Sequence, residues 1–227
     1  MIGIGWYKKS KNDKKIFQYM KEQNKCGSQI WKVFSFPVVL ASASPRRRDI
    51  LNQIGIEPVI MPSQVEEHIT SSDPEQIVKE LSWQKAEDVY RRCQKELGGR
   101  FAVIGADTIV AADGEILGKP KDEEDAKRMI RLISGRVHQV YTGVTILYEG
   151  RTVTFAEKTD VSVAPMTERE IEEYISCGES MDKAGAYGVQ GVFAAFIEGV
   201  NGSYTSVVGL PAGRTYRKLR ELAEGIE

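Results

Sequence analysis

Short apolar runs alternate with amphipathic segments along most of the chain. Runs of apolar and β-branched residues predict strands over residues 38–41, 58–61, 101–112, 137–147, 152–163 and 192–197. Segments opened by Ser, Thr, Asp or Pro signals predict helices over residues 45–54, 73–97, 122–134 and 167–175, and a terminal helix from residue 210. Strands with intervening helices indicate an α/β fold, and the hairpin around Glu149 and Gly150 indicates a mixed sheet.

The first 36 residues differ in charge from the rest of the chain. They hold eight lysines against one aspartate and one glutamate, a net charge of +6, while the whole chain carries −1, so residues 37–227 carry −7. We interpret residues 1–36 as a basic extension outside the main domain. One interpretation is a segment without a function of its own, either a surface appendage or the product of an upstream start codon. The other is a segment that contacts a membrane surface or nucleic acid. Residues 37–227 form the main domain, whose length suits a single core.

Composition narrows the class of protein. Hydrophobic residues at 41% and charged residues at 28% are typical of a soluble globular protein, and no stretch approaches the roughly 20 apolar residues of a membrane span. No apolar segment with a cleavage site follows the basic N-terminus, so no secretory signal is expected. Cys26, Cys93 and Cys177 fit neither a disulfide framework nor a zinc site. We therefore expect a cytoplasmic protein, and the acidic main domain argues against nucleic-acid binding.

Residues 40–48, with the sequence LASASPRRR, carry the strongest local signal for a ligand. A strand ends there, Ser44 occupies an N-cap position, and Pro45 suits the first helical position. Arg46 and Arg47 would then lie at the positive end of the helix dipole, where cations are unfavourable unless an anion is present. The segment therefore predicts a phosphate site. The alternative is a solvated basic helix start.

Asp107 interrupts the apolar run over residues 101–112. A buried carboxylate costs several kcal/mol unless it is paired, hydrogen-bonded or bound to a metal. The alternative is an aspartate at a strand end that faces solvent. Both interpretations place Asp107 at a sheet edge or cleft, where catalytic carboxylates occur.

Four further residues are ambiguous on their own. Lys85 lies on the apolar stripe of its predicted helix, where its stem could extend to solvent or its ammonium could meet a phosphate or carboxylate. Lys119 lies in a predicted loop. Glu66 and Glu67 could contribute to a Mg²⁺ site or form a surface charge pair.

The segment over residues 182–191, DKAGAYGVQG, is rich in glycine, so its backbone could approach a ligand closely. It matches neither the Walker nor the Rossmann fingerprint. His68 and His138 are isolated in the sequence and indicate neither a metal site nor a catalytic triad.

Taken together, these segments resemble the Maf family of nucleotide pyrophosphatases, relatives of the inosine triphosphate pyrophosphatase group. The resemblance runs in the family's order from about residue 37 to the C-terminus and leaves residues 1–36 outside it. The matching motifs are LASASPRRRDIL at 40–51, VEE at 65–67, QKA at 84–86, GADTIV at 105–110, GKP at 118–120, SGRVHQVYTGV at 134–144, DKAGAYGVQG at 182–191 and NGSYTSVVGLP at 201–211.

The resemblance implies a two-lobed α/β fold with a curved mixed sheet, flanking helices and a central cleft. It implies hydrolysis of a nucleoside triphosphate between its α- and β-phosphates, with Mg²⁺ or Mn²⁺ as cofactor and a role in cleaning the nucleotide pool. The form of the glycine-rich segment is similar to the branch that acts on dTTP and UTP. The oligomeric state, a homodimer included, is left open.

The resemblance also implies roles for individual residues. Asp107 becomes the general base and, with Glu67, a metal-site acid. The phosphate-side residues become Ser42, Arg46, Arg47, Lys85 and Lys119. The positions that set base selectivity become Arg46, Thr108 and Gln190.

Three other functions compete with this interpretation. The same chemistry could act on a purine or modified nucleotide. A nucleotide-binding regulator of cell division could keep the site without useful turnover, although such a protein has no need of Asp107. A nucleic-acid binder could use the lysine-rich extension, against which the acidic main domain and the lack of a recognition motif both count.

Overall fold

The computed structural model describes residues 34–96 and 99–225. The basic extension predicted over residues 1–36 therefore lies outside the described residues, except for its last three positions. Phe36 is buried with its ring centroid 4.6 Å from that of Tyr148, and Phe34 packs 6.1 Å from Tyr216. The packed domain thus begins before residue 37.

A mixed sheet forms the centre of the molecule, with the order β2-β1-β3-β5-β6-β7 and β4 paired to β3. β1 is parallel to β2 and β3, and the remaining pairs are antiparallel. The predicted α/β fold with a mixed sheet and flanking helices is confirmed. The strands are β1 (Val38–Leu40), β2 (Val59–Ile60), β3 (Ala102–Ala112), β4 (Glu115–Leu117), β5 (Val137–Tyr148), β6 (Arg151–Val163) and β7 (Ile197–Asn201).

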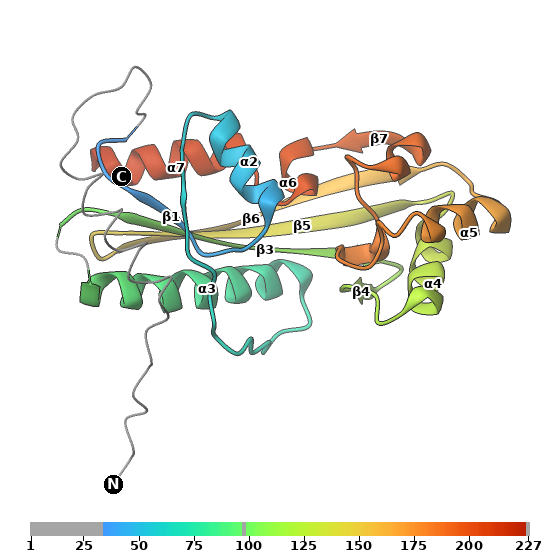
Figure 1. Ribbon diagram of the computed structural model, residues 1–227, viewed down its shortest axis with the longest axis horizontal. Helices are drawn as coiled ribbons and strands as arrows, with labels where there is room; N and C mark the ends of the chain where they lie inside the picture. The colour runs from blue at the N-terminus through green and yellow to red at the C-terminus, as the bar shows by residue number, and fades with distance from the viewer. Residues whose placement is uncertain (1–33, 97–98, 226–227) are drawn as a thin grey trace, which may run out of the picture.

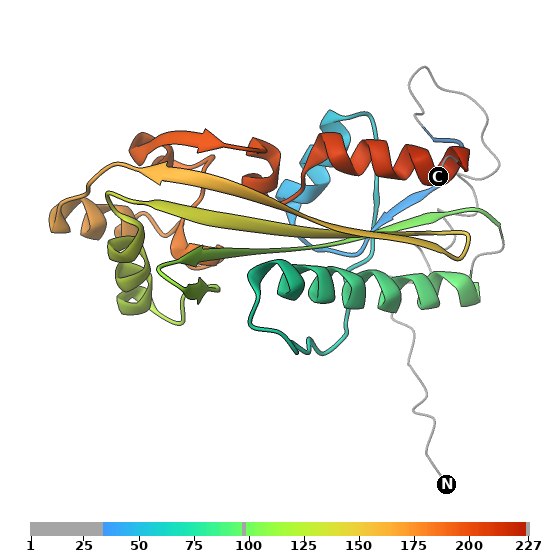
Figure 2. The same ribbon diagram turned by 180° about the vertical axis from the view of Figure 1, so that it is seen from behind.

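Helices cover both faces of the sheet (Figures 1 and 2). The long helix α3 lies along one face, while α2, α6 and α7 lie on the other; α4 and α5 gather at the far end of the long strands. The helices are α2 (Pro45–Gln53), α3 (Pro74–Glu96), α4 (Glu123–Ile133), α5 (Glu168–Ser176), α6 (Tyr204–Val208) and α7 (Ala212–Glu224). Of the described helices, none is long and apolar enough to cross a membrane.

Two glycines allow α3 to lie directly on the sheet. A Cβ atom built on Gly105 of β3 would be 2.2 Å from the Ser82 carbonyl oxygen of α3. One built on Gly143 of β5 would be 2.1 Å from the Val78 carbonyl oxygen. Because no other residue lacks a Cβ atom, glycine at these positions sets the distance between the helix and the strands.

The strand predicted over residues 192–197 is wrong for all but its last residue. Residues Val192–Phe196 form the 3-10 helix η2, and β7 begins only at Ile197. Phe193 is buried, and its ring centroid lies 4.9 Å from that of Tyr174 and 4.8 Å from that of Tyr187. Phe193 therefore packs into this aromatic cluster, whereas Val192 is exposed. Three short elements were not predicted from the sequence: β4, α6 and the 3-10 helix η1 (Ala184–Ala186).

Candidate active site

The central strand β3 has a gap along one edge. β1 pairs with β3 only as far as Ile104, and β4 pairs with it only from Val110. Over the residues between them, β3 pairs with β5 alone within the described chain. Side chains from both faces of the sheet can therefore reach the same space at this edge, which includes Asp107 and Thr108 of β3.

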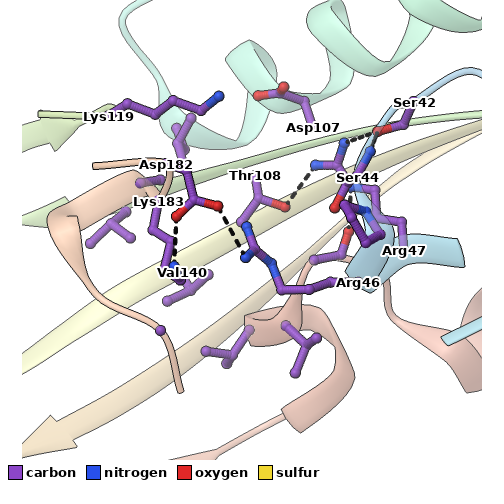
Figure 3. A pocket seen from close by; sticks show the side chains of 18 of the residues that line it. Ser42, Ser44, Arg46, Arg47, Asp107, Thr108, Lys119, Val140, Asp182 and Lys183 are labelled. Atoms are coloured by element: carbon purple, nitrogen blue, oxygen red, sulfur yellow. Dashed lines mark hydrogen bonds and ion pairs between the residues drawn. The ribbon is translucent and has the colours of Figure 1, made fainter. Parts of the chain in front are cut away.

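A cavity of about 1010 Å³ opens at this gap. Its walls come from the end of β1, the start of α2, the middle of α3, β3 and the glycine-rich segment 182–191 (Figure 3). Glu66, the other acid of the predicted pair, does not line the cavity. The nine residues to which the family resemblance assigns a role all line it: Ser42, Arg46, Arg47, Glu67, Lys85, Asp107, Thr108, Lys119 and Gln190. The structure brings them together, and their individual roles remain predictions.

Three hydrogen bonds hold the guanidinium group of Arg47 in the cavity wall. Nε donates to the Gly209 carbonyl oxygen at 2.9 Å, Nη1 to Ser42 Oγ at 3.0 Å, and Nη2 to Thr108 Oγ1 at 3.3 Å. Burial lowers the pKa of Arg47, and the neighbouring carboxylate of Asp107 opposes that effect. The group is oriented before any ligand binds, which reduces the entropy lost on binding a phosphate.

Helix α2 begins at the predicted residue, but the expected capping hydrogen bond from its N-terminus is absent. Pro45 is the first helical residue and Ser44 is the N-cap, yet the Ser44 hydroxyl makes no capping bond. Instead the Ser44 N–H donates to Ser42 Oγ at 3.2 Å, the same oxygen that accepts from Arg47. Ser42 therefore connects the helix start to the arginine.

Arg46 points across the cavity to the glycine-rich segment (Figure 3). Its Nη1 lies 3.5 Å from Asp182 Oδ2, and Lys183 Nζ lies 2.6 Å from the other carboxylate oxygen of Asp182. The Arg46 and Asp182 side chains are 37% and 64% exposed, so water screens this pair and it is weak. Arg46 can consequently leave Asp182 for a more highly charged anion.

Lys85 lies between two carboxylates on the α3 side of the sheet. Its Nζ is 2.5 Å from Asp107 Oδ1 and 2.9 Å from Glu67 Oε1. Of the two alternatives for Lys85, the one in which its ammonium meets a carboxylate is correct. Asp107 is 13% exposed and lies within β3 rather than at a strand end, so the ion pair offsets part of the cost of its burial.

The carboxylates define what kind of metal this cavity could hold. Within the described residues no group of three or more His, Cys, Asp or Glu side chains converges as a metal site. Glu67 and Asp107 supply two carboxylates, which suits a hard cation that takes its other ligands from water and substrate phosphates. A cage built entirely from protein ligands does not fit these residues.

The remaining predicted residues face the cavity without partners in the described chain. The Lys119 ammonium forms no ion pair with the described residues, and the Gln190 side chain is exposed and forms no hydrogen bond to them. Both groups are available to a ligand.

The glycine-rich segment is fixed by residues that the sequence analysis did not single out as site residues. Glu179 accepts from the Val192 N–H at 3.0 Å, and its main-chain oxygen accepts from Lys183 Nζ at 2.5 Å. The buried side chains of His138 and Tyr187 meet at 2.7 Å between Nε2 and the hydroxyl oxygen. Only the tertiary structure pairs these residues, because 49 positions separate His138 from Tyr187.

Comparison with known proteins identifies the family. The family model described as Maf-like protein matches residues 37–222. This chain belongs to the Maf-like protein family. The resemblance stated from the sequence motifs is therefore confirmed, and the nine candidate site residues of this Maf-like chain all lie within the matched range.

Two curated relatives are similar over most of their length. A dTTP/UTP pyrophosphatase of Agathobacter rectalis is 53% identical, over 82% of this Maf-like chain and 97% of the relative. A dTTP/UTP pyrophosphatase of Lachnoclostridium phytofermentans is 46% identical, over 82% and 95%. Among solved structures, a nucleoside-triphosphatase / dITP/XTP pyrophosphatase of Mycobacterium abscessus is 14% identical, over 83% of this chain and 94% of that one, with a TM-score of 0.34.

Proposed function

We propose that this protein hydrolyses dTTP and UTP to the nucleoside monophosphate and pyrophosphate. The observation that carries the proposal is the cavity at the β3 gap, where Asp107 and several cations converge. The relatives named dTTP/UTP pyrophosphatase support the choice of substrate.

The cations of the cavity suit a triphosphate, which carries about four negative charges near neutral pH. Arg47 is held in place, Arg46 is in a weak exposed pair, and Lys119 is unpaired within the described residues. Forked guanidinium groups bind phosphate oxygens through two N–H donors at once. Charge that develops on the leaving pyrophosphate would therefore be stabilised by groups already in position.

Asp107 is the general base in this proposal. Its carboxylate would accept a proton from a water molecule whose oxygen attacks the α-phosphorus. The bond between that phosphorus and the oxygen bridging to the β-phosphate breaks, and its electrons leave with pyrophosphate. Lys85 orients the Asp107 carboxylate through the contact at 2.5 Å.

Glu67 and Asp107 would hold a divalent cation, Mg²⁺ or Mn²⁺. When bound, such a cation neutralises charge on the phosphate oxygens and orients them. Lys85 lies within contact distance of both carboxylates, so it keeps them facing the cavity.

Gln190 would read the base. Its primary amide offers one donor and one acceptor, which complement the 4-keto group and N3–H of uracil and thymine. Arg46 and Thr108 hold the other selectivity positions implied by the family resemblance. Thr108 Oγ1 accepts a hydrogen bond from Arg47 and lies 2.9 Å from Thr142 Oγ1. Thr108 would therefore affect selectivity indirectly, by helping to hold Arg47 in position.

The test is an assay of pyrophosphate release with dTTP, UTP, CTP, ATP, GTP and ITP in parallel, each with Mg²⁺ and with Mn²⁺. We expect the largest kcat/KM for dTTP and UTP. A preference for a purine triphosphate would show that the proposed substrates are wrong, while the proposed hydrolysis between the α- and β-phosphates would stand. Tight binding of nucleotides without release of pyrophosphate would instead indicate a nucleotide-binding regulator.

A further inference from the structure

The segment that carries Glu67 has little structure of its own. Residues 61–73 are described throughout and form no helix or strand between β2 and α3. Residues 64–70 are exposed, and the Glu67 side chain is 47% exposed. A carboxylate in such a segment is ordered only by the bonds that attach the segment to the rest of the fold.

One face of α3 supplies three of these attachments. Glu80, Gln84 and Asp88 are spaced by four residues and so project from the same side of the helix. Each accepts a backbone N–H of the segment, which runs antiparallel to the helix: Thr70 to Glu80 at 3.0 Å, His68 to Gln84 at 2.9 Å, and Gln64 to Asp88 at 2.9 Å.

Gln84 differs from the two acids because its amide both accepts and donates. Oε1 accepts from the His68 N–H at 2.9 Å, and Nε2 donates to the His68 carbonyl oxygen at 2.6 Å. This pair of bonds fixes the direction of the peptide groups on both sides of His68, as a neighbouring strand would. A carboxylate could accept the first bond but could not donate the second.

The residue after Gln84 completes the arrangement. Lys85 contacts the Glu67 carboxylate at 2.9 Å, while Gln84 holds the backbone of His68, the next residue after Glu67. Two consecutive side chains of α3 thus hold the carboxylate of Glu67 and the backbone of the residue that follows it. Since Lys85 also contacts Asp107, the position of Glu67 relative to Asp107 depends on both attachments.

We propose that Gln84 is a positioning residue that holds Glu67 where it can share a divalent cation with Asp107. The proposal rests on the function proposed above, because it takes Glu67 as a metal-site acid. Residues that orient metal ligands commonly contribute 10- to 100-fold to metal affinity, and we expect an effect near the lower end because Lys85 remains.

The test compares Gln84→Met with Gln84→Glu. Met has a similar length and removes both bonds to His68, whereas Glu keeps only the acceptor. Titration of the free protein with Mn²⁺, followed by electron paramagnetic resonance, should show affinity roughly tenfold weaker for Gln84→Met, with a smaller loss for Gln84→Glu. Amide hydrogen exchange over residues 64–70 should be faster in both variants, while kcat at saturating Mn²⁺ changes less than the affinity.

Gln94→Met is the matched control, because Gln94 is exposed on the same helix and does not line the cavity. It should match the unmodified protein in Mn²⁺ affinity and in exchange over residues 64–70. Unchanged exchange and affinity in Gln84→Met would overturn the proposal, as would faster exchange with unchanged affinity.

Glu67→Gln separates this proposal from the proposed metal site. If Glu67→Gln weakens Mn²⁺ binding and Gln84→Met does not, Glu67 binds the metal and Gln84 does not position it. If Glu67→Gln leaves Mn²⁺ binding unchanged, the metal site itself is wrong, and with it the role of Gln84. In the expected case, adding Gln84→Met to Glu67→Gln weakens Mn²⁺ binding no further.

Discussion

The ammonium nitrogen of Lys85 on α3 lies 2.5 Å from Oδ1 of Asp107 on β3. The contact exists because α3 approaches the sheet over Gly105 and Gly143, where side chains with a Cβ atom would collide with the helix backbone. An amphipathic helix with a lysine on its apolar side is thereby brought against an apolar strand that contains a single acid. The charges of Lys85 and Asp107, each unusual among apolar residues, therefore pair with each other beside the unpaired edge of β3.

Asp107→Asn should retain the fold and lose turnover by roughly 10²–10⁴-fold, the usual contribution of a positioned acid or base. The measurement is kcat for dTTP at saturating Mg²⁺, with circular dichroism to check folding. Asp49→Asn is the control, since Asp49 is exposed on α2 and does not line the cavity. Near-normal kcat in Asp107→Asn would remove this residue from the mechanism.

Removal of divalent cations should abolish activity, because the two carboxylates of the cavity add negative charge beside a triphosphate and a cation must offset it. We expect no pyrophosphate release in excess EDTA and full recovery on addition of Mg²⁺ or Mn²⁺. Activity that persists undiminished in EDTA would contradict the metal site proposed on Glu67 and Asp107.

Gln190→Ala should lower kcat/KM for dTTP and UTP. The loss should correspond to roughly 1–3 kcal/mol of transition-state stabilisation, the cost of leaving polar groups of the base without partners. Inhibition by pyrophosphate should change little, because the cationic groups are untouched. The variant is measured on dTTP, UTP and GTP side by side. Equal losses on all three nucleotides would show that Gln190 supports the glycine-rich segment rather than reads the base.

The N-terminal boundary can be tested with two truncations. Every candidate site residue lies beyond residue 36, so deletion of residues 1–33 should leave kcat/KM essentially unchanged. Deletion of residues 1–36 also removes Phe34 and the buried Phe36, and it should lower the free energy of unfolding by about 3 kcal/mol. Both are measured by urea unfolding and by the dTTP assay. A large loss of kcat/KM in the shorter deletion, with the fold intact, would assign the basic segment to the site.

His138 should make stability depend on pH. Burial lowers its pKa to about 4, below the value of about 6.5 expected in the unfolded chain. Between these values the unfolded state binds the proton and the folded state does not, so the free energy of unfolding falls as the pH drops from about 6.5 towards 4. The contribution lost is about 3 kcal/mol at pH 4.

The measurement for His138 is the free energy of unfolding in urea at pH 7 and at pH 4.5, for the unmodified protein and for His138→Gln. The variant should be less stable at pH 7, because the hydrogen bond to Tyr187 is altered, but its stability should fall less between the two pH values. Equal falls in both proteins would show that His138 does not carry this pH dependence.

The sequence by itself determined most of the local structure and the chemistry of the candidate residues. The helix at residues 45–53 begins where Pro45 predicts its first residue, and the strand at residues 102–112 follows from its apolar run with β-branched residues. The sequence also indicated a ligand site, because some residues depart from their local pattern. Arg46 and Arg47 place positive charge at a helix start, and Asp107 interrupts an apolar strand. Such signals need only neighbouring residues, since backbone preference and hydrophobic period act over a few positions.

Only the tertiary structure decided which of these residues share a site and what holds them. The gap in β3 depends on where β1 ends and β4 begins, and the Gln84 bonds to His68 depend on the path of a segment without regular structure. Residues 192–196 form a 3-10 helix in which Phe193 packs against both Tyr174 and Tyr187. These outcomes arise from contacts between residues far apart in the chain, and the packing free energy of such contacts can exceed the local preference of a short apolar run.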